Sequence, residues 1–227
     1  MKKISTLMLV LAIFALAFSN STAAKDFKGV ITYKISYSGT DLDDQTKAML
    51  PKMMIYKIKN NLARTEMDMA GMGKQVQIIN GDEKVVYSLM DIMGQKMVIK
   101  MTEEDINEEM GKQPEFSLQQ YDETKEIAGY ECKKAVVSSE DESGNKTSFI
   151  VYYTEELGGS KLNFDNPMFK DINGVLMEFE MEQGSMKMKL EAVSVKKENV
   201  PDSDFEIPEG YKELTKEEMQ NMFGGGM

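Results

Sequence analysis

The chain has 227 residues, with 38 acidic side chains against 27 basic ones and a formal net charge of −11. A surface of this sign repels nucleic acid and anionic membrane faces, so we expect no nucleic-acid partner. The absence of histidine excludes Ser–His–Asp and Cys–His catalytic arrangements and the usual zinc sites.

The first 24 residues have the pattern of a secretory signal peptide. Lys2 and Lys3 precede an apolar run over 4–18, and small residues follow it. The run is short for a membrane-spanning helix, so we expect cleavage after Ala24 rather than an uncleaved anchor. No second apolar run of membrane length follows, which predicts a periplasmic or secreted protein without a transmembrane span after cleavage. Cys132 is the only cysteine, so no lipidated N-terminal cysteine is expected.

Strict alternation of apolar and polar residues predicts a first strand over 27–38. A short helix is expected after it, opened by Thr40 or Asp41 and ended by Pro51. Five strands follow at 53–59, 62–69, 75–79, 84–92 and 96–101, joined by short turns that include Asn80-Gly81. Neighbouring strands with such turns predict an antiparallel meander.

The second half of the chain is also predicted to consist mainly of strands, with an irregular segment between them. Thr102 and Asp105 predict a capping box and a short helix in which Ile106 and Met110 lie one turn apart. Strands are expected at 117–127, 130–139 and 147–154, then an irregular segment over 155–173 and a hairpin over 175–195. A second capping box begins at Thr215, so 215–227 is expected to form a short C-terminal helix and a flexible tail.

The hairpin over 175–195 has one apolar face and one charged face at period two. A tight turn at Gln183-Gly184 would set both faces in register. The expected cross-strand pairs are Met181 with Met186, Phe179 with Met188, Met177 with Leu190, Glu180 with Lys187 and Glu178 with Lys189.

Strands this closely spaced leave no room for parallel crossovers. The sequence therefore predicts a mainly β (α+β) fold, with 25–214 as a single domain built on one large curved antiparallel sheet, an open half-barrel. Two or three short helices are expected on its concave face as a lid, through Leu42, Met49, Ile106 and Met110.

Four segments carry a resemblance to a known family. They are FKGVITYKI near the start, EIAGYECKKAVV in the middle, INGVLMEFEME in the hairpin and a closing DFEIPEGYKEL. In this order they resemble exported proteins of unknown function of Gram-negative envelopes that share the lipoprotein-carrier (LolA/LolB-like) half-barrel. The resemblance implies an unclosed, curved sheet with short helices as a lid or plug, and in carrier members the cavity holds acyl chains. It implies no catalytic residues.

The 21 methionines allow three interpretations: core filling, a soft wall for apolar ligands, and thioether coordination of Cu(I). The copper candidates are Met67, Met69 and Met72. The candidate ligand-binding residues, all expected on the hydrophobic concave face, are Ile31, Tyr33, Ile35, Met177, Phe179, Met181, Met186, Met188, Leu190 and Met110.

The sequence therefore favours a non-enzymatic, exported binding or carrier protein without a cofactor. Its expected partner is a lipid or other hydrophobic ligand, or a second envelope protein. The alternatives are a methionine-rich Cu(I)-handling protein and a structural envelope module whose concavity is plugged by its own chain.

Overall fold

The computed structural model describes residues 27–39, 43–69, 73–92, 94–140, 144, 146–183, 186–215 and 218. The expected signal peptide, Leu42, Met72 and most of the expected C-terminal helix lie outside these residues. Within them, no helix is long and apolar enough to cross a membrane.

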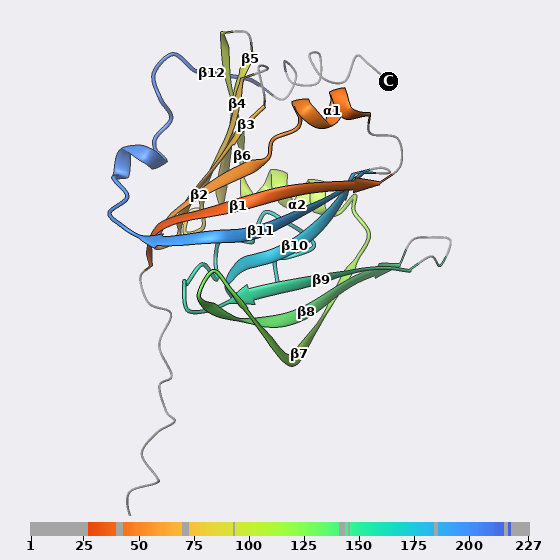
Figure 1. The fold of residues 1–227 in the computed structure, drawn as a ribbon. Coiled ribbons are helices and arrows are strands. Elements are labelled where there is room, and N and C mark those ends of the chain that lie inside the picture. The colour runs from red at the N-terminus through yellow and green to blue at the C-terminus, as the bar shows by residue number, and fades with distance from the viewer. Residues whose placement is uncertain are drawn as a thin grey trace, which may run out of the picture.

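Twelve described strands, two α-helices and one 3-10 helix follow one another along the chain (Figure 1). Their bounds are β1 Lys28–Gly39, α1 Asp44–Met49, β2 Met53–Lys59, β3 Leu62–Asp68, β4 Lys74–Asn80, β5 Val85–Ile92, β6 Gln95–Met101, α2 Glu103–Met110, β7 Phe116–Ile127, β8 Tyr130–Glu140, β9 Lys146–Thr154, β10 Val175–Gln183, β11 Met186–Lys197, η1 Asp202–Phe205 and β12 Lys212–Glu213.

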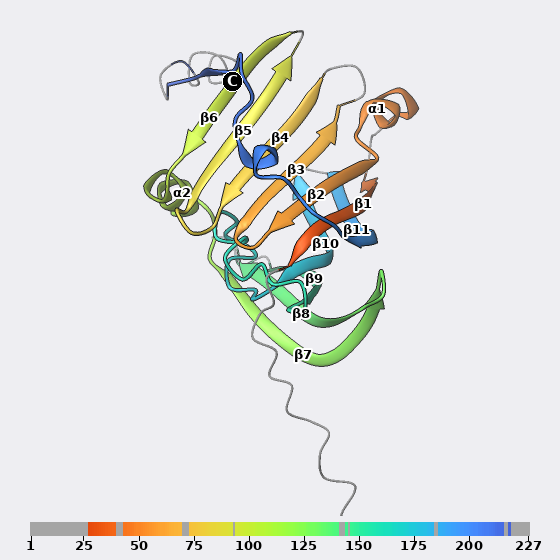
Figure 2. The ribbon, with the colours of Figure 1, turned by 90° about the vertical axis from the view of Figure 1, so that its left-hand side faces the viewer.

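The described strands form a single sheet in the order β12-β6-β5-β4-β3-β2-β1-β11-β10-β9-β8-β7. Every neighbouring pair is antiparallel except β12 and β6, which are parallel. The sheet curves so that β7–β9 lie below the fan of β2–β6 (Figure 2). The expected mainly β, open architecture is confirmed.

Strand β1 lies in the middle of the sheet and joins its two halves. Its burial alternates as the sequence predicts, with Ile31, Tyr33 and Ile35 buried and Lys34 exposed. Gly29 is required here because a Cβ atom at this position would lie 2.2 Å from the carbonyl oxygen of Lys196 on β11. The close backbone approach of β1 and β11 therefore depends on that glycine.

The hairpin of β10 and β11 forms, but its register differs from the expected one by two residues. Phe179 pairs with Leu190 rather than Met188, Met181 with Met188, and Gln183 with Met186. Likewise, the charged pairs are Glu180 with Lys189 and Glu182 with Lys187, while Glu178 lies opposite Glu191 and forms ion pairs with Lys189 and Lys125. A shift of two preserves both faces, because the side-chain period of a strand is two.

The main cover of the concave face differs from the expected lid of short helices. Residues 155–174, here named the covering segment, pack Leu157, Leu162, Phe169 and Ile172 into the main core. Of the expected lid residues, Ile106 on α2 is buried, but Met49 on α1 is 46% exposed. Because α1 has only six residues, it presents too short an apolar face to fill the concavity.

The opposite face of the sheet also carries an apolar cluster. Val76, Ile78, Leu89 and Val98 are buried there beneath Phe205 and Tyr211. These two aromatic residues belong to residues 198–214, here named the outer segment, which crosses the outside of the sheet and ends at β12 (Figure 2). The sheet is therefore covered on both faces over β4–β6.

Ion pairs and hydrogen bonds fasten the outer segment. Lys59 pairs with Asp202 at 2.5 Å and Lys57 with Asp204 at 3.2 Å, while Arg64 Nη1 donates to the Asp204 carbonyl oxygen at 3.0 Å. The expected capping box at the start of α2 is confirmed, with the Thr102 and Asp105 side chains each bonded to the other's backbone N–H.

The assignment of faces in β10 predicts a large difference between neighbouring substitutions. Phe179→Asp places a charge in the core and should lower the free energy of unfolding by about 3 kcal/mol or more. Glu180→Ala, on the other face, should change it by less than about 1 kcal/mol. Urea denaturation of the two variants measures this difference, and equal losses would contradict the assignment.

Candidate functional site

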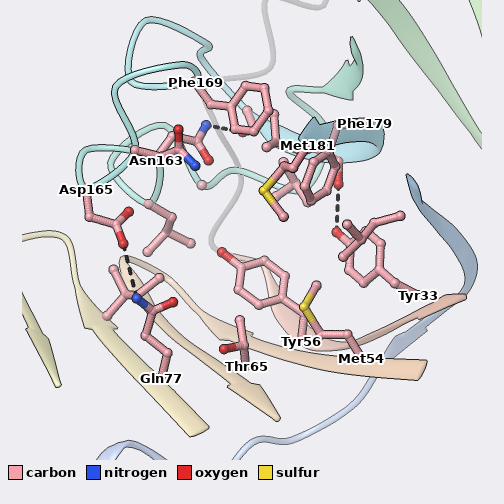
Figure 3. Close-up of a pocket in the computed structure, with 18 of the residues that line it drawn as sticks. Tyr33, Met54, Tyr56, Thr65, Gln77, Asn163, Asp165, Phe169, Phe179 and Met181 are labelled. Atoms are coloured by element: carbon pink, nitrogen blue, oxygen red, sulfur yellow. Dashed lines mark hydrogen bonds between the residues drawn. The ribbon is translucent and has the colours of Figure 1, made fainter. Parts of the chain in front are cut away.

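A cavity of about 220 Å³ remains between the concave face and the covering segment (Figure 3). Its walls come from β1–β4, β10 and β11 on the sheet side, and from Gly159 to Gly174 on the other. It is larger than the apolar cavity of about 150 Å³ that binds benzene in an engineered protein. The covering segment thus fills the concavity only in part.

One end of the cavity is apolar and aromatic. Phe179 lies at the centre, with its ring 6.3 Å from that of Tyr33 and 5.4 Å from that of Phe169, both in edge-to-face geometry. Met181 and Met54 extend this surface (Figure 3). Thioethers and rings form an adaptable apolar wall, because methionine side chains adjust their shape at little cost.

Buried hydrogen bonds hold the roof of the cavity in place. The amide nitrogen of Asn163 donates to the carbonyl oxygens of Ile172 and Gly174, both at 2.9 Å. The Tyr33 hydroxyl donates to the Leu176 carbonyl oxygen at 2.7 Å, directly after the covering segment ends. Gly174 is needed at that point, because its φ is +152° and a Cβ would lie 2.5 Å from the Thr154 carbonyl oxygen. The roof is therefore part of the folded core.

The other end of the cavity is polar. Gln77 Nε2 donates to Asp165 Oδ2 at 3.5 Å, and the hydroxyl of Tyr56 points into the same space (Figure 3). Burial raises the pKa of the Asp165 carboxyl to about 6. Burial, and then the nearby Asp165 carboxyl, raise the pKa of the Tyr56 phenol. Here the polar end is defined as Tyr56, Thr65, Gln77 and Asp165.

A second cavity of about 210 Å³ lies on the other side of the Gln77–Asp165 pair. It is lined by these two residues and by residues of α2 and β5–β6, including Ile106, Met110 and Glu109. The pair therefore stands between the two spaces.

The structure distributes the sequence-predicted ligand residues over several environments. Tyr33, Phe179, Met181, Met188 and Leu190 line the first cavity, and Met110 lines the second. Ile31, Ile35 and Met177 are buried in the main core and line neither cavity, and Met186 is half-buried at the start of β11. The predicted set thus combines wall residues with core residues.

The polar end was not predicted from the sequence. Asp165 lies in the irregular segment, where no periodicity marks a face, and Gln77 looks like a solvated residue between two apolar ones. The only available signal was the position of Gln77 between Val76 and Ile78.

The copper candidates are only partly placed. Met67 lines the first cavity, Met69 lies just beyond the end of β3, and Met72 lies outside the described residues. No group of three or more Cys, Asp or Glu side chains suited to a metal occurs in the described part of the chain. The thioether site stays a prediction.

Cys132 is fully buried in β8. Burial raises the pKa of its thiol to about 11, so the reactive thiolate is disfavoured at neutral pH.

No protein-family model and no curated protein sequence matches the chain. One similar solved structure is the beta-barrel-like protein of a domain of unknown function, DUF1849, from Brucella abortus, at 10% identity, covering 78% of this chain and 100% of that one with a TM-score of 0.35. Another is LprF from Mycobacterium bovis, at 10% identity, covering 78% of this chain and 89% of that one with a TM-score of 0.33. Similarity at this level says nothing about a ligand, and membership of the carrier-like family stays a prediction.

The raised pKa of Asp165 predicts a pH-dependent effect of Asp165→Asn. Between about pH 4 and pH 6 the folded protein keeps a proton that the unfolded chain has lost, so ionisation of Asp165 lowers stability as the pH rises through that window. The variant should therefore gain roughly 1–3 kcal/mol of unfolding free energy over the wild type at pH 7.5 and little at pH 4.

Chemical denaturation at the two pH values measures this gain, with Asp171→Asn as an exposed control in the same segment. A difference between variant and wild type that is the same at both pH values would show that Asp165 ionises normally.

Proposed function

We propose that the protein is a non-enzymatic binding or carrier protein that holds an apolar group in the cavity under the covering segment. The observation that carries the proposal is the space of about 220 Å³ with an apolar, aromatic wall on the concave face. Ligand sites are typically concave, mostly apolar and supplied with a few convergent polar groups. The polar end of this cavity supplies such groups.

The size of the cavity limits what it can hold. At about 220 Å³ it is smaller than typical pockets for drug-sized ligands, which occupy about 300–1,000 Å³. It suits one small aromatic molecule or part of one alkyl chain rather than several acyl chains. Each buried methylene contributes about 0.8 kcal/mol, so even a partial chain binds measurably.

The expected export of the chain is consistent with this proposal. A signal peptide would deliver the protein to an envelope or extracellular space, where the apolar parts of lipids and other envelope proteins are available as ligands. We therefore include periplasmic or secreted localisation in the proposal.

The chain contains no tryptophan, so a single introduced indole reports on one place. In Met181→Trp the indole lines the cavity; in Met53→Trp it lies at a 44% exposed position of β2 that lines a different, shallow hollow. N-phenyl-1-naphthylamine, a neutral apolar dye, should bind the folded protein saturably. By displacing water around the indole, it should shift the emission of Met181→Trp to shorter wavelength.

The emission of Met53→Trp should shift clearly less, because Met53 lies outside the cavity and lines a different hollow. Dye binding that appears only in partly unfolded protein would refute the proposal. It would favour the structural alternative, in which the covering segment acts as a permanent plug.

A further inference from the structure

The polar end of the cavity contains a carboxylate that the surrounding protein does not neutralise. Asp165 accepts one side-chain hydrogen bond, from Gln77 at 3.5 Å, which is long for such a bond. Among the described residues, no positive side chain is found to act on its charge. The one opposing contact is a hydrogen bond from its own backbone N–H, and burial outweighs it. An ionised carboxyl in such a place is costly unless a partner is supplied.

The two cavities offer no cation of their own. The residues that line them include no lysine and no arginine in the described part of the chain. The acidic residues among them are Asp165 and, on α2 beside the second cavity, Glu109. The other titratable groups are the phenols of Tyr33 on β1 and Tyr56 on β2, and the Tyr33 hydroxyl already donates to a backbone carbonyl. A ligand group that enters the polar end therefore meets net negative charge.

We propose that this cavity selects amphiphiles with a protonated amine head, a conclusion that rests on the proposed function and specifies its ligand. The ammonium lies at the carboxylate of Asp165 and donates a second hydrogen bond to the Tyr56 hydroxyl. The apolar tail lies against Phe179 and Met181. An ammonium brings three donors and a positive charge, whereas a carboxylate head would bring a second negative charge to the same place.

The selection is measured by displacement of N-phenyl-1-naphthylamine from the wild-type protein at pH 7.5. The competitors are decylamine, decanol and decanoate, which share one tail and differ in the head. Decylamine should displace the dye at concentrations about tenfold to a hundredfold lower than decanoate does, with decanol between them, because a charge-assisted hydrogen bond replaces a repulsion.

Two variants locate the effect. In Asp165→Asn the preference for decylamine over decanol should fall to less than about threefold, since the amide keeps the shape and loses the charge. In Glu109→Gln the preference should remain, because that carboxyl lies outside the first cavity. At pH 5, below the pKa of about 6 of Asp165, the wild type should likewise lose most of its preference for the amine over the alcohol.

The outcomes separate this inference from the proposed function. Equal displacement by all three compounds, or loss of the preference in Glu109→Gln alone, would overturn the selection for amines and leave apolar binding intact. Displacement by none of them, although the dye binds, would also overturn it, because the cavity would then not accept a linear amphiphile. If the dye itself does not bind the folded protein, the proposed function fails as well.

Discussion

The structure depends on one constraint: the described strands form a single curved sheet with apolar residues on both faces, and none of them forms a second sheet that could cover it. Burial of apolar surface is the dominant favourable term in folding, so each face must find a cover elsewhere in the chain. The covering segment supplies the inner cover with Leu162 and Phe169, and the outer segment supplies the outer one with Phe205 and Tyr211. Both covers are irregular chain that hydrogen bonds and ion pairs hold in place. The covering segment does not fill the whole inner face, and the space that remains is the cavity.

The strands and their faces could be predicted because period-two patterning is local. The alternation of Ile31, Tyr33 and Ile35 in β1 reads directly from the sequence. The register of β10 against β11 could not be predicted, because a shift of two residues leaves the same side chains on the same faces. The pairing of Gln183 with Met186 defines the register. In hairpins the register follows from the length and type of the connection, which the pattern of the strands does not encode.

The site was harder to predict than the fold, for a physical reason that β4 illustrates. Val76 and Ile78 face outward, under the outer segment, and Gln77 between them faces the cavity. In a sheet with one solvated face, the pattern would instead predict that Val76 and Ile78 face the core and that Gln77 faces solvent. When both faces of a strand are buried, the difference between an apolar and a polar face no longer shows which residues point toward the core. In β4, Gln77 is the polar residue between Val76 and Ile78, and it is the one that lines the cavity. The partner of Gln77, Asp165, comes from a segment with no pattern at all.

The central position of β1 has a consequence for how the protein forms. Its two neighbours are β2, the next strand along the chain, and β11, the last of the long strands. During folding, β1 can pair with β2 early, but its other edge stays unpaired until the chain is present as far as β11. Contacts between such distant segments form slowly, because the intervening chain must first be ordered. An unpaired edge beside buried apolar residues such as Ile31 is also a template for pairing with other molecules. The time needed for β1 to pair with β11 therefore determines how long the newly made chain stays prone to aggregation.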